Sequence, residues 1–182
     1  RAQYPYHYRN PWGATTEEET AERALAALKE QVKFTIGEEE VAAFLIEPAL
    51  GDGGYLPTPP RFLDGLRERA TEHGILLIID EVQAGVGRTG KFWGHQHSNA
   101  TPDILITAKG IASGFPISAI AASEKLMSKA WPGSQGGTYG GNAVAAAAGV
   151  ATLDVIEDEK LVENSRVRGE ELADGLALLQ GQ

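Results

Sequence analysis

The chain has 182 residues, of which 42% are hydrophobic and 23% are charged, as is ordinary for a globular domain with a sizeable core. Its formal net charge of −9 argues against nucleic acid or an anionic membrane surface as a partner. It contains no Cys, which excludes disulfide and thiolate chemistry and fits a cytoplasmic location. No apolar stretch is long enough to cross a bilayer.

The first predicted element is a helix that follows an irregular opening segment. Residues 1–14 begin with Arg rather than Met, and we expect the chain to be a piece of a longer polypeptide. Thr15 and Thr16 each stand three residues before a glutamate, which is the spacing of a capping box. The acidic residues suit the positive end of a helix, and apolar residues at helical spacing continue to Val32.

Three apolar runs rich in Ile, Leu and Val predict strands that are buried on both faces of a parallel sheet. They span residues 41–46, 74–79 and 103–108, and they lead into Glu47, Asp80 and Lys109. In open α/β sheets, ligands bind outside the carboxyl ends of the strands. The sequence therefore predicts that two acids and a lysine converge on one pocket.

A helix between the first two runs completes the spacing of a βαβ unit. We expect Thr58 as its N-cap, Pro59 as its first residue and Gly74 at its end. Farther along, residues 117–122 are compatible with a short strand, and Ser123 with the cap of a helix that runs to about residue 130.

The last part of the chain predicts two more helices. Residues 143–156 are apolar nearly all round, which is typical of a buried helix. A more polar helix from about Asp158 closes the chain. The whole sequence then predicts an α/β fold with three layers, in which helices flank a mostly parallel sheet.

The residues at the strand ends each allow more than one role. A partly desolvated Lys109 could form a Schiff base with a carbonyl compound, although a lysine is more often a solvated surface residue. Asp80 could take a proton, pair with a ring nitrogen or cap a turn. No His or carboxylate is suitably spaced around it, so we expect no metal site. Glu47 fits either a strand-end acid or a substrate-facing residue.

Two glycine-rich loops also need interpretation. The string GVGRTG at 85–90 superficially resembles a phosphate-binding loop, yet it matches neither the dinucleotide-binding nor the P-loop pattern. The string QGGTYGGN at 135–142 offers backbone N–H groups, the Thr138 hydroxyl and a following helix N-terminus, all suited to an anion. A plain flexible turn is the alternative for the second loop.

These signals in this order resemble the class III aminotransferases, and most of all the 4-aminobutyrate aminotransferase branch. The resemblance is carried by residues 46–54, 76–94, 102–119 and 136–145, which include IIDEVQAGVGRTG, AKG and GGTYGGN. It implies the large domain of a fold type I enzyme that uses pyridoxal 5′-phosphate. Residues 1–182 would form the central part of that domain. The family's N-terminal segment and C-terminal domain would lie outside it.

The resemblance also implies roles in catalysis. Lys109 would form the Schiff base with the cofactor and carry the proton between substrate and cofactor. Asp80 would pair with the protonated pyridine nitrogen, Val82 would pack on the ring face, and Gln83 would bind the ring hydroxyl oxygen.

Two further roles concern the phosphate and the substrate. Thr138 would bind the cofactor phosphate, typically that of the neighbouring subunit in a homodimer or higher homo-oligomer. Glu47 would pair with an active-site arginine, so that one pocket could accept both the amino donor and the 2-oxo acid.

The activity implied is transfer of an amino group from an ω-amino acid or amine, such as 4-aminobutyrate, to a 2-oxo acid. Acetylornithine or ornithine aminotransferase, a semialdehyde aminomutase and a dialkylglycine decarboxylase are alternatives, because all share the same lysine and aspartate. An alternative of a different class is a non-catalytic fragment. Without the family's phosphate loop, a buried cofactor phosphate would lose most of its donors.

Overall fold

The computed structural model describes residues 1–180, which fall into two compact units. The first unit contains residues 1–80 and 95–105, and the second contains residues 81–94 and those from 106 onward. No helix within residues 1–180 is both long and apolar enough to span a membrane.

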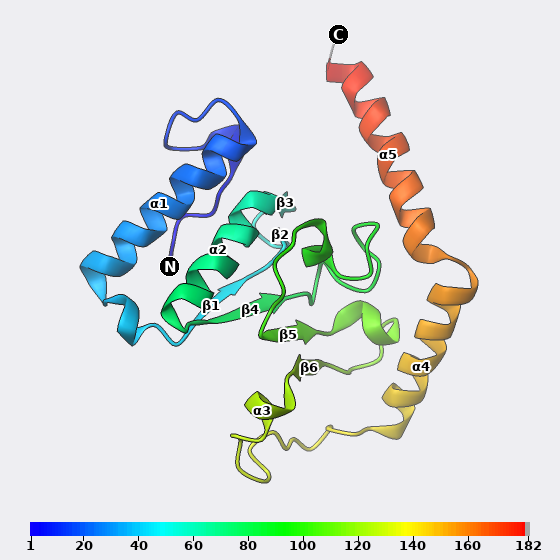
Figure 1. Ribbon diagram of the computed structural model, residues 1–182. Helices are drawn as coiled ribbons and strands as arrows, with labels where there is room; N and C mark the ends of the chain where they lie inside the picture. Colours follow the sequence, from blue (N-terminus) through cyan, green and yellow to red (C-terminus); the bar gives the residue numbers. More distant parts are fainter. Residues whose placement is uncertain (181–182) are drawn as a thin grey trace. The chain divides into compact units, whose positions relative to one another are not determined.

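Six strands form two sheets (Figure 1). The larger sheet has the order β1-β4-β5-β6, and the smaller one pairs β2 with β3. The strands are β1 (Ala43–Ile46), β2 (Ala49–Leu50), β3 (Leu56–Pro57), β4 (Leu76–Asp80), β5 (Ile104–Thr107) and β6 (Ala119–Ala122). All four strands predicted from the sequence are present, each shorter than its apolar run.

Parallel pairing of β1 with β4 forms the centre of the first unit. The register runs from Ala43 opposite Leu76 to Ile46 opposite Ile79. Leu77 and Ile79, on one face of β4, are fully buried in the core, whereas Leu76 and Ile78 on the other face are half-buried. Leu45 of β1 is 65% exposed, so the prediction that the strands are buried on both faces is wrong for these residues. The predicted α/β architecture is nevertheless confirmed.

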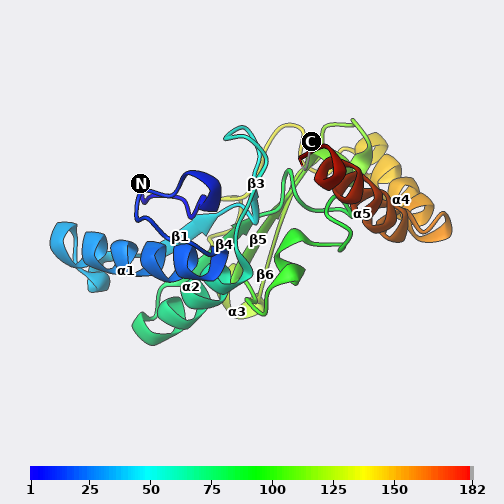
Figure 2. The ribbon, with the colours of Figure 1, turned by 90° about the horizontal axis from the view of Figure 1, so that it is seen from above.

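Helix α1 (Glu17–Thr35) begins as the capping pattern predicts. The Thr16 hydroxyl accepts the Glu19 N–H at 3.1 Å, and the Glu19 carboxylate accepts the Thr15 N–H at 2.8 Å. This exchange satisfies two backbone donors around the first turn. The buried face of α1 packs against α2, and Figure 2 shows the two helices side by side.

Helix α2 (Pro60–His73) contradicts two predictions about its start, since Pro59 is its N-cap and not its first residue, and confirms the predicted end. Thr58 is not its N-cap, because the cap position is Pro59 and has no side-chain hydrogen bond. The Thr58 hydroxyl instead donates to the Glu47 carbonyl at 2.9 Å and contacts the Tyr4 hydroxyl. These long-range contacts compete with local capping. Gly74 ends the helix at φ 68°, as predicted.

An ion pair connects α2 to the start of β5. The Asp103 carboxylate accepts the Leu77 N–H at 2.8 Å and pairs with Arg67 at 2.7 Å. Burial acts to raise the pKa of Asp103, but the Leu77 hydrogen bond and the Arg67 charge together lower it. The carboxylate therefore stabilises the folded state when it is ionised.

The second unit contains α3 (Glu124–Met127), α4 (Ala143–Asp158) and α5 (Leu161–Gln180). Ser123 precedes α3, as predicted, but its side chain makes no capping hydrogen bond and the helix is shorter than expected. The polar closing helix is confirmed as α5.

The prediction that 143–156 is a buried helix is wrong for this chain. Helix α4 is present, yet Val144 and Val150 are 64% and 61% exposed, and only Ala145 and Gly149 are buried. Within the second unit α4 packs on the turn Lys109–Ala112 and on α5. These partners cover a single stripe of the helix, so most of its apolar surface stays open.

We predict that Asp103→Asn lowers the free energy of unfolding by about 1 kcal/mol at pH 7, because the Arg67 pair is lost while an amide oxygen can still accept the Leu77 N–H. A lowered folded-state pKa stabilises the protein above the unfolded pKa of about 4, and this contribution disappears as pH falls through the folded value. Urea unfolding from pH 7 to pH 3 should therefore show that the difference in free energy of unfolding between wild type and variant shrinks below about pH 4. Asp174→Asn, at an exposed position of α5, is the matched control. A difference that stays constant across this range would contradict the prediction.

Candidate functional site

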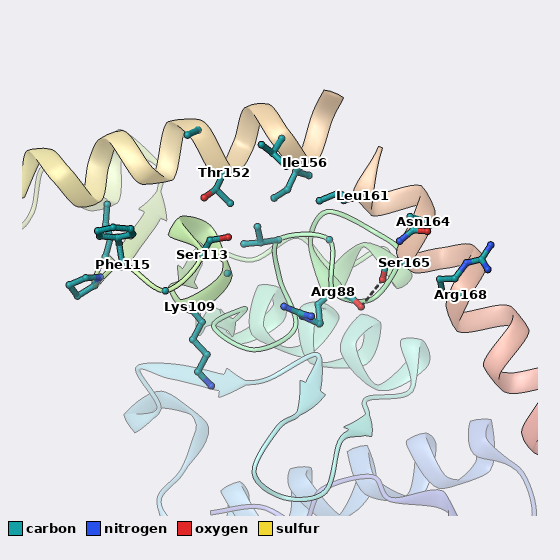
Figure 3. Close-up of a pocket in the computed structure, with 18 residues that line it drawn as sticks. Arg88, Lys109, Ser113, Phe115, Thr152, Ile156, Leu161, Asn164, Ser165 and Arg168 are labelled. Atoms are coloured by element: carbon teal, nitrogen blue, oxygen red, sulfur yellow. Dashed lines mark hydrogen bonds between the residues drawn. The ribbon is translucent and has the colours of Figure 1, made fainter. Parts of the chain in front are cut away.

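Lys109 stands in a strained position directly after β5. Its φ angle is 45°, in the left-handed region, which costs a residue other than glycine about 1–2 kcal/mol. It opens the 3₁₀ turn Lys109–Ala112, and its side chain is exposed. Figure 3 shows this side chain pointing away from Thr152 and Ile156 of α4. Strain of this kind persists where the surrounding structure holds it, and functional sites are common locations.

The amine of Lys109 is held by a second predicted site residue. Its Nζ donates a hydrogen bond of 2.5 Å to Gln83 Oε1. Gln83 belongs to the segment 81–94, which lies in the same unit as Lys109. The structure therefore brings together Lys109 and Gln83, which are 26 residues apart in the chain. A charge-assisted hydrogen bond of this length fixes the position of the nitrogen.

The segment 81–94 is anchored by Glu81, which is fully buried. Its backbone N–H donates to the Ile106 carbonyl at 2.8 Å, and its carboxylate accepts the Gly94 N–H at 2.8 Å. Its carbonyl also accepts the Gly85 N–H at 2.9 Å. Both ends of the segment are thereby fixed beside β5. The sequence places this acid inside the motif but gives no signal of its burial.

The glycine-rich string at 85–90 packs against α5. A side chain at Gly90 would place its Cβ 3.0 Å from Arg166 Cα, and one at Gly87 would lie 3.2 Å from Val162 Cγ2. The Ser165 hydroxyl donates to the Arg88 carbonyl at 3.0 Å. These glycines therefore allow a close approach between the loop and a helix, which agrees with the absence of a phosphate-loop pattern.

A cleft of about 1170 Å³ lies beside this loop in the second unit (Figure 3). Lys109, Arg88 and Arg168 line it together with apolar side chains such as Phe115 and Ile156, and none of its lining residues is acidic. An apolar cleft with basic groups suits an organic anion. Thr138 and Gln83 are not among the residues that line it.

The two acids lie at the carboxyl edge of the paired strands in the first unit. Ile46 and Ile79 are register partners, so Glu47 and Asp80 each stand one residue beyond the same rung. The Glu47 carboxylate accepts the Gly51 N–H at 2.9 Å, so it shapes the loop that follows β1. Lys109 belongs to the second unit, and convergence of all three side chains stays a prediction.

The remaining predicted residues are Val82, which is half-buried, and Thr138, which is exposed in the loop before α4. The Asn142 side chain accepts the N–H groups of Val144 and Ala145 at 2.9 and 3.1 Å. The N-terminus of α4 is thus capped from within the chain. The Thr138 hydroxyl and the loop backbone are the groups that remain for an anion.

Comparison with known proteins gives matches over the whole chain. The model of the family "Aminotransferase class-III" matches residues 1–182. The 5-aminovalerate aminotransferase of Pseudomonas putida is 41% identical over 86% of this chain and 37% of its own length. The acetylornithine aminotransferase of Synechocystis is 44% identical over 80% of this chain and 34% of its own length.

A solved structure gives a match of similar extent. It is a pyridoxal-phosphate-bound amine transaminase from an uncultivated Pseudomonas species, with a TM-score of 0.90 and 34% identity. The match covers 98% of this chain and 42% of that structure. This likeness confirms the expected fold type I architecture. The chain spans little more than a third of the length of these curated relatives. Because the family model matches all of its residues, the chain belongs to the class III aminotransferase family.

Proposed function

We propose that this protein is a pyridoxal-phosphate-dependent transaminase that moves an amino group from an ω-amino acid or amine to a 2-oxo acid. The observation that carries the proposal is the strained Lys109 at the end of β5, whose amine is held by Gln83. A primary amine fixed in this way is suited to covalent chemistry with an aldehyde. Membership of the class III aminotransferase family supports the same assignment.

The side chains of the site fit the chemistry of pyridoxal 5′-phosphate. We assign Lys109 to the aldehyde, Gln83 to the ring hydroxyl oxygen, Asp80 to the ring nitrogen and Val82 to the ring face. We assign Thr138 to the phosphate, where its hydroxyl and the surrounding loop offer hydrogen-bond donors. When bound, the cofactor supplies an electron sink for a carbanion next to the amino group.

The residues of the chain then have distinct tasks. Lys109 Nζ would hold the cofactor through its aldehyde and, when free, would move a proton as general acid and base. The Asp80 carboxylate holds a proton on the ring nitrogen through its negative charge. The half-buried Val82 keeps one face of the ring apolar and excludes water from it.

The proposed amino donor is a short chain with a terminal amine, as in 4-aminobutyrate. The relatives named above act on 5-aminovalerate and acetylornithine, and both compounds carry an amine some distance from a carboxylate. Acetylornithine and ornithine are therefore the alternative donors. A non-catalytic fragment is the alternative function, and the labelling experiment below distinguishes it from an enzyme.

We further propose that the protein acts as a homodimer or higher homo-oligomer. The exposed apolar side chains of α4, including Val144 and Val150, form the kind of surface that soluble proteins normally cover. A cytoplasmic location is proposed because none of the 182 residues is a cysteine, so nothing in the sequence requires an oxidising compartment.

We predict that borohydride reduction of the full-length protein with pyridoxal 5′-phosphate fixes the cofactor on Lys109. The strained backbone and the contact with Gln83 distinguish this amine from the other lysines. Peptide mapping by mass spectrometry identifies the modified residue. Modification at Lys91, Lys125 or Lys129 would contradict the assignment. If the 182-residue chain by itself is not modified under the same conditions, the non-catalytic fragment is favoured.

We predict that Asp80→Asn slows amino transfer by two orders of magnitude or more. Loss of a matched charge in a low-dielectric site costs about 3–5 kcal/mol, and each 1.4 kcal/mol is a factor of ten in rate. Single-turnover kinetics with an ω-amino acid measure the step directly. Asp154→Asn, at an exposed position on α4, controls for the loss of one carboxylate. Turnover of Asp80→Asn near the wild-type rate would show that Asp80 has a structural role instead.

We predict that Glu47→Gln keeps the free energy of unfolding near that of wild type, whereas Glu47→Ala loses about 1 kcal/mol. An amide oxygen can still accept the Gly51 N–H, but alanine leaves that donor unpaired. Denaturant unfolding of both variants checks this. A change in the relative kcat/KM for amino donor and 2-oxo acid in Glu47→Gln, at unchanged stability, would show that the charge also acts on the substrate.

A further inference from the structure

Val86 has a backbone conformation that is unusual for its side chain. Its φ angle is 58°, in the left-handed region, where a β-branched residue is a genuine outlier. Glycine adopts this conformation without steric cost, and glycine occupies both neighbouring positions, 85 and 87. A valine at this position therefore carries strain that a glycine would remove.

The loop around Val86 is held so that the strain cannot relax. On one side the Gly85 N–H donates to the Glu81 carbonyl at 2.9 Å, and on the other the Gly87 N–H donates to the Phe92 carbonyl at 3.0 Å. A Cβ atom at Gly85 would lie 2.9 Å from the Trp93 ring, so Trp93 packs closely on the backbone there. Val86 is thus fixed between two anchored glycines.

The side chain of Val86 lies against the residue that follows Lys109. A Cβ atom added at Gly110 would lie 3.5 Å from Val86 Cβ and 3.9 Å from its Cγ1. Val86, Gly110 and Lys109 all line the same cleft. Two strained residues in the second unit, Val86 at φ 58° and Lys109 at φ 45°, therefore meet through the backbone of Gly110.

We propose that Val86 and Gln83 are positioning residues that hold Lys109 at two points before the cofactor arrives. Gln83 holds the amine through its 2.5 Å hydrogen bond, and the Val86 side chain borders the Gly110 backbone and limits the space into which that backbone can move. This inference rests on the proposed role of Lys109 in the transaminase reaction. It explains why a strained valine stands in a loop of glycines, because a glycine at position 86 would form the same turn but could not contact Gly110.

The test uses the cofactor-free full-length protein and measures how fast each lysine reacts with trinitrobenzenesulfonate. Peptide mass spectrometry gives the rate at Lys109, and the exposed Lys125 and Lys129 serve as internal references. In Val86→Gly and Gln83→Leu we expect Lys109 to react about three- to tenfold faster than in wild type, the range for loss of one modest interaction. In Val86→Ala, which keeps the Cβ atom nearest Gly110, we expect a smaller increase. The reference lysines should react at unchanged rates.

Unfolding of the two Val86 variants provides a second readout, in which relief of backbone strain by glycine opposes its larger entropy loss on folding. Val86→Gly should unfold at a higher denaturant concentration than Val86→Ala, because alanine keeps the left-handed strain and glycine does not. Lys160→Gly is the matched control. Lys160 also has a left-handed φ, 53°, at the turn between α4 and α5, and its replacement should leave the reaction at Lys109 unchanged.

These experiments test the positioning role of Val86 separately from the proposed transaminase function of Lys109. Wild-type reactivity of Lys109 in the Val86 variants would overturn the role of Val86 even if borohydride maps the cofactor to Lys109. Acceleration by Lys160→Gly as large as by Val86→Gly would also overturn it, since the effect would then be general loosening. Modification of a different lysine by borohydride would reject the proposed function and leave the reactivity measurement interpretable.

Discussion

The arrangement of the candidate site depends on how Glu81 fixes the start of the segment 81–94. Burying a carboxylate is costly unless its oxygens are hydrogen-bonded, and here the Gly94 N–H is one donor. The backbone N–H of Glu81 simultaneously bonds to Ile106 on β5. One residue thus closes the loop on itself and joins it to the strand that ends before Lys109. These bonds hold the start of the loop, and with it Gln83, beside the strand that leads to the lysine.

Within the second unit, a continuous series of contacts connects α5 to Lys109. Val162 and Arg166 pack closely on Gly87 and Gly90, and Ser165 donates to the Arg88 carbonyl. Close packing of backbone on helix is stiff, because there are no flexible side-chain ends that could move apart. The glycines of this loop therefore let α5 pack closely on the loop that borders the turn at Lys109. The superficial likeness to a phosphate-binding loop did not indicate this packing.

The sequence predicted the strands, the start of α1 and the end of α2 because local patterns determine them. Continuous apolar runs, a capping box and a glycine with positive φ each act over a few residues. The capping role of Thr58 failed because its hydroxyl is used by Glu47 and Tyr4, which lie far away in the sequence. Burial of α4 failed because a helix that is apolar all round needs partners on every side, and the second unit supplies them on one.

The residues of the candidate site also fall into those that the sequence predicts and one that depends on packing. The motif and the strand ends predict Lys109, Gln83, Asp80 and Glu47 as site residues, and of these the structure shows Lys109 and Gln83 hydrogen-bonded. No pattern could mark Val86, since its proposed role depends on a backbone angle and on its place beside Gly110, both of which arise from packing.

Glu47 is a residue that the sequence predicts but whose structural contact the sequence does not show. Its position at a strand end suggested a charge that faces the substrate, yet its carboxylate accepts the Gly51 N–H. An acid that already bonds to its own loop fixes the shape of that loop whatever else its charge does. If Glu47 faces the substrate as proposed, the residues of this loop, and not only the acid, would shape that side of the site.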